Sequence, residues 1–242
     1  MILTLNKIHV SREGAEVIHG VSLRIASGEV HALMGPNGSG KSSLANAVMG
    51  HPKYQLTSGE ISLNNENITA LSPHEKAKRG LFLALQNPPE IGGVSVMNFL
   101  RAALNAVRSE PINVIAFHAL LKKTLQEMNI ESTLANRPLN EGFSGGEKKR
   151  IEMLQLRLLA PSFAILDETD AGLDVDAMQI MTSTVSALRS QGTGFLIISH
   201  YPKIFDLLIP DKVSILHQGD VVATGGPTLI KKIERDGYGS EK

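Results

Sequence analysis

A glycine-rich segment between a short apolar run and an amphipathic one constrains this sequence more than any other feature. Residues 29–34 suit a buried strand, and residues 41–49 carry apolar side chains at helical spacing. The segment that joins these two ranges, and that includes the first two residues of the second, is Gly35, Pro36, Asn37, Gly38, Ser39, Gly40, Lys41 and Ser42. Glycines let successive backbone N–H groups turn inward, and the N-terminus of the next helix adds partial positive charge. The succession predicts an α/β fold with an anion-binding loop.

This segment matches the phosphate loop of nucleotide-binding proteins, in which each side chain has a defined task. Lys41 would reach the β- and γ-phosphates, and the Ser42 hydroxyl would be a magnesium ligand. We include Ser43, the next residue, among the nucleotide-binding residues. The alternative is a glycine-rich turn with a surface lysine. We favour the phosphate loop because all four fixed positions of the motif and both flanking elements are present.

Composition limits the classes of partner. The 242 residues contain 24 Lys and Arg against 24 Asp and Glu, so no bulk charge favours nucleic acid or an acidic membrane surface. The longest stretch without these four residue types, residues 190–202, is shorter than the roughly 18 apolar residues of a membrane-spanning helix. We expect no nucleic-acid partner and no direct membrane insertion.

The sequence contains no cysteine, which agrees with a reducing compartment. This chain therefore has no thiolate with which to hold zinc or an iron–sulfur cluster, so such chemistry would belong to a partner. The first ten residues lack the basic start and continuous apolar run of a secretory leader. We expect a cytoplasmic protein, or one of the plastid stroma in a eukaryote.

Periodicity places the remaining elements. Strands are expected at residues 2–10, 15–25, 59–63, 163–166, 195–198, 213–216 and 221–223, with a turn at 12–14 and a closing hairpin formed by the last two. Helices are expected at residues 96–107, 112–128 and 145–159, which form a helical insert. The runs at 163–166 and 195–198 suit central parallel strands buried on both faces.

Two adjacent carboxylates, Asp167 and Glu168, follow the strand expected at residues 163–166. We place this strand beside the phosphate loop in a parallel sheet, with its carboxyl end toward the ligand crevice. Asp167 would hold magnesium directly or through water, and Glu168, pointing the other way, would polarise an attacking water. Adjacent acids after a strand also occur in solvated turns and at helix N-termini. The phosphate loop favours the functional interpretation.

A second glycine pair opens the helix expected at residues 145–159. Ser144 at the N-cap and Glu147 three residues later predict a capping box. Gly145 and Gly146 would each cost up to about 1 kcal/mol relative to alanine in the first helical turn. Helix stability does not explain them, whereas a bare backbone that approaches a phosphate does.

From about Leu3 to the C-terminus, these residues resemble the ATP-binding cassette (ABC) ATPase family. Residues 143–147 resemble its signature motif, normally Leu-Ser-Gly-Gly-Gln, with Phe and Glu as the first and last residues. Gln86 resembles the Q-loop glutamine that senses magnesium and the lytic water. His200 resembles the switch histidine that contacts the γ-phosphate, although a lone histidine after a strand is more often an ordinary surface residue.

The resemblance implies a P-loop NTPase fold with a RecA-like core, an N-terminal antiparallel β subdomain and an inserted helical subdomain, all in one domain of residues 1–242. Residues 1–87 and 160–242 would form the core with the β subdomain, and residues 88–159 the helical subdomain. It also implies Mg2+-dependent ATP hydrolysis with Glu168, His200 and Gln86 as catalytic residues and Ser42, Gln86 and Asp167 around the metal. In the family's head-to-tail dimer, Ser144, Gly145 and Gly146 of one subunit would close over the phosphate loop of the other.

Family members usually stack adenine on an aromatic side chain in the region that corresponds to residues 10–17, which contains none here. Arg12 would take that place by cation–π stacking, or Val17 would hold adenine loosely.

Several details resemble one branch of the family, the SufC-type ATPase of the SUF iron–sulfur cluster assembly system. Transporter subunits usually read Glu-Pro-Thr-Ser-Ala-Leu-Asp from the second acid onward, whereas residues 168–174 read Glu-Thr-Asp-Ala-Gly-Leu-Asp. Tyr201 follows the switch histidine, where transporters usually have Asp. This branch implies scaffold partners of the SufB and SufD type.

Two other classes stay open. The first is the ATP-binding subunit of an ABC membrane transporter, which would share every nucleotide-site residue. The second is a P-loop kinase or a nucleic-acid-processing ATPase, which would leave the signature segment unexplained.

In the family, the surface beside the Q-loop docks on the partner, and here that surface is residues 87–94. We expect Ile91 and Val94 to face solvent as an apolar docking point. The alternative is that both fold back into the helical insert.

Overall fold

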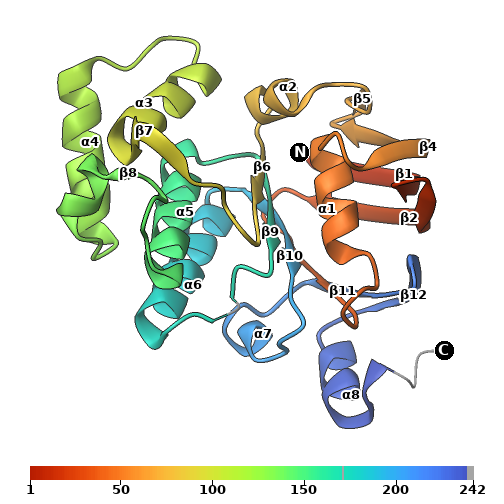
Figure 1. The fold of residues 1–242 in the computed structure, drawn as a ribbon. Helices are drawn as coiled ribbons and strands as arrows, with labels where there is room; N and C mark the ends of the chain where they lie inside the picture. The colour runs from red at the N-terminus through yellow and green to blue at the C-terminus, as the bar shows by residue number, and fades with distance from the viewer. Residues whose placement is uncertain (171, 239–242) are drawn as a thin grey trace.

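A six-stranded sheet forms the centre of the molecule, for which a computed structural model describes residues 1–170 and 172–238. Its strand order is β12 (Asp220–Gly225), β11 (Lys212–His217), β3 (Val30–Met34), β10 (Gly194–Ile198), β9 (Phe163–Asp167) and β6 (Leu81–Ala84) (Figure 1). All neighbours are parallel except the β11–β12 hairpin. Every residue of β3, β9 and β10 is buried, as expected for parallel strands covered on both faces.

The position of β9 in this sheet corrects one expectation. β9 is a parallel strand, but β10 lies between it and β3, the strand that leads into the phosphate loop. Helix α6 (Val175–Ser190) connects β9 to β10, and β10 then lies between β3 and β9. An apolar run shows that a strand is buried but not which strand it pairs with, and so the order was not predictable from it.

A second, antiparallel sheet has the order β2 (Ala15–Ala26), β1 (Ile2–Arg12), β4 (Gln55–Leu63) and β5 (Glu66–Asn67). Its β1–β2 turn is shorter than expected: Arg12 still belongs to β1, and only Glu13 and Gly14 turn, both at positive φ. β4 begins four residues earlier than expected because Gln55 already pairs with Ser11.

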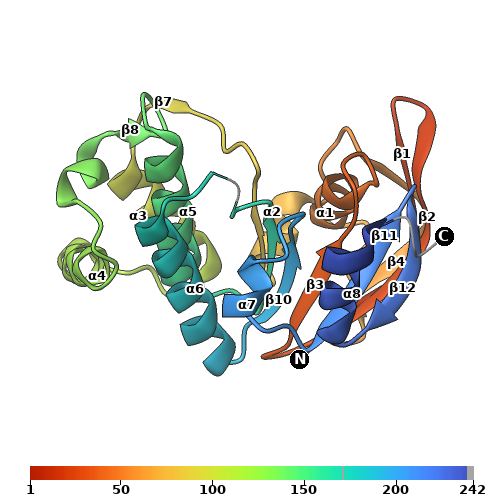
Figure 2. The ribbon, with the colours of Figure 1, turned by 90° about the horizontal axis from the view of Figure 1, so that it is seen from below.

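Helix α1 (Lys41–Met49) lies between the two sheets (Figures 1 and 2). Its buried Leu44 and Val48 belong to one apolar cluster with Leu5 of β1 and with Ile165 and Leu196 of the central sheet. Packing against both sheets therefore fixes the position of α1, whose N-terminus follows the glycine-rich loop.

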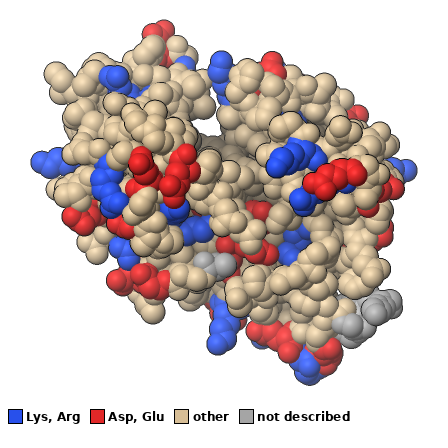
Figure 3. All heavy atoms as spheres, in the orientation of Figure 1, with Lys and Arg blue, Asp and Glu red and all other residues tan. Residues whose placement is uncertain are grey.

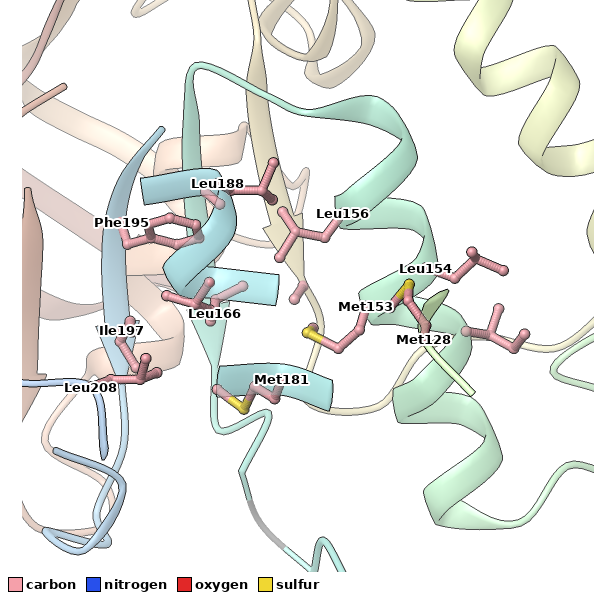
Figure 4. Close-up of a cluster of buried hydrophobic side chains, with 14 of the residues drawn as sticks. Met128, Met153, Leu154, Leu156, Leu166, Met181, Leu188, Phe195, Ile197 and Leu208 are labelled. Atoms are coloured by element: carbon pink, nitrogen blue, oxygen red, sulfur yellow. The ribbon is translucent and has the colours of Figure 1, made fainter. Parts of the chain in front are cut away.

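The other face of the central sheet is covered by α6 and α5 (Gly145–Leu159). Figure 4 shows Met153 of α5 beside Met181 of α6 and Leu156 of α5 beside Leu188 of α6, with Leu166 and Phe195 of the sheet in the same buried cluster. Beyond α5 lie α3 (Val96–Val107), α4 (Val114–Glu127), the 3-10 helix η1 (Ser132–Asn136) and the two-stranded sheet of β7 (Ile91–Ser95) and β8 (Pro138–Leu139) (Figure 2).

Most of these elements have the predicted bounds. The helices at 41–49, 96–107 and 145–159 agree with the sequence, and α4 begins at Val114 because Asn113 caps it. The β7–β8 pair was not predicted, since residues 87–94 were expected to be a docking surface beside the Q-loop. The limits of the helical subdomain at residues 88 and 159 stay a prediction.

Three short helices complete the described chain: α2 (Pro73–Lys78), α7 (Ile204–Leu207) and α8 (Thr228–Asp236). None of the helices in residues 1–170 and 172–238 combines the length and the apolar character that crossing a bilayer requires. On the face seen in Figure 3, acidic and basic side chains are interspersed, as the zero net charge suggests.

Candidate active site

The glycine-rich loop joins β3 to α1 at the carboxyl edge of the central sheet, and two of its glycines are required by close packing. A Cβ on Gly35 would lie 2.1 Å from the backbone oxygen of Leu216 on β11. Gly40 has φ of 105°, and a Cβ there would lie 2.7 Å from Cδ1 of Ile18. The neighbouring strands thus leave room only for glycine, and this fixes the loop's backbone.

Lys41 folds back over the loop that precedes it. Its Nζ donates to the backbone oxygens of Gly35 at 2.9 Å and Pro36 at 3.0 Å. Burial lowers the pKa of Lys41, while the charges of Glu168 and Asp167 act in the opposite direction. The cation is therefore held at the loop, where it can neutralise a phosphate.

The loop also contains a polar atom with no bond of its own. Ser39 Oγ is buried and has no hydrogen-bond partner in the described part of the chain. An unpaired buried hydroxyl in a glycine-rich loop before a helix N-terminus fits a loop that receives an anion.

Two of the three residues expected around the magnesium ion, Ser42 and Asp167, lie together. Ser42 Oγ donates to Asp167 Oδ1 at 3.0 Å, although the two residues are far apart in sequence. Burial raises the pKa of Asp167 to about 6, and a bound cation would favour the ionised form.

A hydroxyl and a carboxylate oxygen suit Mg2+, which takes one or two protein ligands and completes its shell with water and phosphate oxygens. The described residues contain no cluster of three His, Cys, Asp or Glu that could hold a metal without a nucleotide. The donor set fits Mg2+ bound together with phosphates, where the ion would neutralise the charge that develops on them.

The three expected catalytic residues come from the ends of three neighbouring strands. Gln86 follows β6, Glu168 follows β9 and His200 follows β10. Gln86 Nε2 donates to Glu168 Oε2 at 2.5 Å, and His200 Nδ1 lies 3.4 Å from Glu168 Oε1. Glu168 has a left-handed backbone, with φ of 48°, and its N–H donates to the backbone oxygen of Ile198 at 2.9 Å. One carboxylate thus faces both an amide and an imidazole.

A hollow of about 420 Å3 opens over this edge of the sheet. Its lining brings together ten residues: Arg12, Val17, Asn37, Gly38, Gly40, Lys41, Ser42, Ser43, Gln86 and Glu168. All of these were named from the sequence as candidate nucleotide-site residues, and the volume suits a small ligand.

Arg12 lies at the end of the hollow where adenine was expected. It also contacts an aromatic ring that the sequence did not predict. Its Cζ lies 5.6 Å from the centroid of the Tyr54 ring, within cation–π range. Tyr54 packs against the core beneath the antiparallel sheet. No local signal links residues 12 and 54, because only the pairing of β1 with β4 brings them close.

The signature segment does not reach this hollow. Ser144 caps α5 and forms the predicted capping box: Ser144 Oγ accepts from the N–H of Glu147 at 3.2 Å, and Glu147 Oε2 accepts from the N–H of Ser144 at 2.7 Å. These bonds lower the pKa of Glu147. Gly145 has no atom within 4 Å of the position a Cβ would take, and for Gly146 the nearest is Asp174 Oδ2 at 3.9 Å. Neither glycine is required by packing within this chain.

Two buried charged residues of α5 bind the backbone of Leu85 and Gln86, and neither contact was predicted from the sequence. Lys149 Nζ donates to the backbone oxygens of Leu85 at 3.1 Å and Gln86 at 3.3 Å. Glu152 Oε1 accepts from the N–H of Leu85 at 2.8 Å. The available signal was a pair of opposite charges three residues apart on a helix face that is otherwise buried.

Comparison with known proteins identifies the family. Residues 18–171 match the sequence model of the family described as "ABC transporter". The chain belongs to the ABC transporter ATPase family. It is 45% identical over 238 residues to "Vegetative protein 296" of Bacillus subtilis, covering 98% of this chain and 91% of the relative. It is also 45% identical over 241 residues to "Probable ATP-dependent transporter ycf16" of Cyanophora paradoxa, covering 98% and 93%.

Solved structures agree with the fold. An "ATP binding subunit of ABC transporter" superposes with a TM-score of 0.82 at 25% identity, covering 99% of this chain and 95% of that one. An ABC transporter cassette in its ADP conformation gives a TM-score of 0.77 at 27% identity, covering 97% and 95%. The protein is therefore an ATPase of the ABC type that uses ATP and Mg2+.

Proposed function

We propose that this ABC ATPase drives iron–sulfur cluster assembly on a separate scaffold of the SufB and SufD type. The observation that carries the proposal is the set of departures from the transporter pattern within residues 168–174, Asp170 among them, and at Tyr201. Ala171 of the same segment lies outside the described residues. The absence of cysteine agrees with a chain that supplies ATP chemistry while a partner holds the cluster.

In this proposal the site works by positioning and electrostatics. Lys41 and the loop N–H groups bind the β- and γ-phosphates, and Ser42 and Asp167 bind Mg2+. Glu168 polarises the attacking water, with Gln86 and His200 beside its carboxylate at 2.5 Å and 3.4 Å. Arg12, whose Cζ lies 5.6 Å from the Tyr54 ring centroid, would hold the base by cation–π stacking.

We propose that two copies pair head to tail around ATP. The support is that Ser144, Gly145 and Gly146 do not line their own chain's hollow and that open space surrounds Gly145. A phosphate held by a second copy can then approach this bare backbone and the N-terminus of α5. Each ATP would lie between the phosphate loop of one copy and the signature segment of the other.

The docking surface needs one correction before it can be tested. Ile91 does not face solvent as expected but packs partly against the core, because β7 pairs with β8 at Leu139. Val94 remains 37% exposed. The segment before β7 is held by Lys148 to Glu90 at 2.8 Å and by Asn140 Nδ2 to the oxygen of Pro89 at 2.8 Å. We propose that the scaffold docks through Val94, which lies within β7.

The test uses the purified chain and purified SufB and SufD scaffold. Val94→Asp should keep ATP affinity and lose scaffold binding, because a charge replaces an exposed apolar contact. The matched control is Val222→Asp, at a 40% exposed valine on β12, which should keep both. Unchanged scaffold binding by Val94→Asp removes this surface from the interface.

The competing function is that of an ATP-binding subunit in a membrane transporter, and the name of the Cyanophora relative, "Probable ATP-dependent transporter ycf16", favours it. The same purified chain distinguishes the two. ATPase activity that rises with the scaffold supports cluster assembly. Absence of any binding to the scaffold, together with copurification with a membrane-spanning chain, would overturn the proposal in favour of transport.

A further inference from the structure

Asp170 and Tyr201, two of the residues that depart from the transporter pattern, contact one serine. Ser199 Oγ donates to Asp170 Oδ2 at 2.6 Å and accepts from the N–H of Tyr201 at 2.9 Å. Ser199 is fully buried and Asp170 is 6% exposed. This short, charge-assisted bond inside the protein joins the segment after β9 to the segment after β10.

These bonds bracket His200. Ser199 precedes it and Tyr201 follows it, so the hydroxyl holds the backbone on both sides of the histidine. The Tyr201 ring also lies against the imidazole, with centroids 4.0 Å apart. A separate backbone bond, from the N–H of Glu168 to Ile198, fixes the carboxylate that faces His200 at 3.4 Å. Two hydrogen bonds thus join the segment after β9 to the end of β10 and the residue after it: Glu168 to Ile198, and Ser199 to Asp170. The Glu168–His200 contact lies beside both.

The free-energy cost of burying the Asp170 carboxylate argues against a purely structural role for it. Burial raises the pKa of Asp170, while its bond to Ser199 and the nearby His200 act in the opposite direction. A neutral side chain in the core would avoid the desolvation of a carboxylate. A carboxylate that is retained and satisfied here fixes one loop geometry strongly, as buried hydrogen-bond networks do.

We infer that Asp170 and Ser199 are positioning residues for hydrolysis: they hold His200 at the distance from Glu168 that the reaction requires. The inference rests on the proposed roles of Glu168 and His200. It also gives Asp170 and Tyr201 one shared physical task. Neither Asp170 nor Ser199 contacts substrate in this account, because both act through the orientation of the imidazole.

The test measures ATP hydrolysis under single-turnover conditions, with enzyme in excess, so that slow variants remain measurable. Ser199→Ala and Asp170→Ala should each lower the rate constant about tenfold, since small misplacements of reacting groups have effects of this size or larger. ATP affinity should stay within about twofold. Ser199→Thr, which keeps the hydroxyl, should retain the rate. Ser214→Ala is the matched control: it removes another fully buried, hydrogen-bonded hydroxyl, on β11, and should keep the parent rate.

A double-mutant cycle identifies His200 as the route of the effect. In a His200→Ala background, Ser199→Ala should cause no further loss. In isotope-labelled histidine spectra, the ring signals of His200 should shift in Ser199→Ala and stay unchanged in Ser214→Ala.

Three results would overturn the inference: a parent-like rate in both Ser199→Ala and Asp170→Ala, an equal loss with and without His200, or loss of ATP affinity together with a lower Tm than in Ser214→Ala. A parent-like rate in His200→Ala alone would instead refute the proposed role of His200.

Discussion

Lys76 allows the effect of one buried charge on the free energy of unfolding to be measured. It lies on α2 with 1% of its side chain exposed, and its Nζ donates to the backbone oxygen of Val48 near the end of α1 at 2.8 Å. Burial lowers the pKa of Lys76 from 10.5 to about 8. The folded protein therefore releases this proton at a lower pH than the unfolded chain does.

The sign and size of the effect follow from linkage. Below pH 8 the lysine is charged in both states, and the full burial cost is present. Between about pH 8 and pH 10.5 the unfolded chain binds more protons, so the free energy of unfolding rises with pH. A shift from 10.5 to about 8 corresponds to about 3 kcal/mol. Between pH 7 and 10 we expect the parent to gain about 2 kcal/mol from this residue, allowing for residual solvent contact.

Lys76→Met removes the charge and keeps the length of the side chain. At pH 7 it should be at least as stable as the parent, because the removed burial cost exceeds the roughly 1 kcal/mol of the lost hydrogen bond to Val48. Urea unfolding at pH 7 and pH 10 measures both proteins, and their difference cancels other titrating groups. Lys78→Met, on the exposed face of the same helix, is the control and should show no such pH dependence. If the difference between parent and Lys76→Met is the same at both pH values, Lys76 titrates normally and the reasoning fails.

Three further outcomes concern the nucleotide site. Lys41→Ala should lose most ATP affinity and activity in a binding titration, because Lys41 is the loop's only side-chain cation; hydrolysis at the parent rate would refute its role. Glu168→Gln should keep Mg2+ and ATP binding, lose hydrolysis and elute as an ATP-bridged pair in size-exclusion chromatography, whereas a monomer with bound ATP would contradict the composite site. The Mg2+ concentration for half-maximal activity should rise as pH falls below about 6, because protons then compete for Asp167. Equal Mg2+ requirements at pH 5.5 and 7.5 would argue against Asp167 as a ligand.

The parts of the molecule that depend on local sequence were predictable from it. The glycine-rich loop, the helix of residues 41–49 and the helix capped by Ser144 have the expected bounds. A cap and the spacing of apolar side chains act within a few residues, and so they remain visible without the tertiary structure. The same holds for the hairpin of β11 and β12, whose turn residues Gln218 and Gly219 both have positive φ.

What joins these parts was not predictable, because it is decided between distant segments. The insertion of β10 between β3 and β9, the pairing of Ile91 with Leu139 and the Tyr54 ring beside Arg12 leave no periodic pattern in the chain. Each arises from a choice among several apolar or aromatic partners of similar burial. The sequence therefore predicted the candidate site residues, and the structure supplied the contacts that orient them.

The two glycine-rich segments look alike in sequence, yet they are constrained by different neighbours. Gly35 and Gly40 leave no room for a Cβ because β11 and β2 pack against them, so the fold of this chain alone requires glycine there. Gly145 meets nothing within 4 Å, although it sits in a helical turn where alanine would be more stable by up to about 1 kcal/mol. Packing within this chain does not explain the cost of glycine at this position, whereas a molecule that approaches the N-terminus of α5 from outside would. This supports the proposed head-to-tail pair, in which the phosphate loop of one copy and the signature segment of the other enclose each ATP.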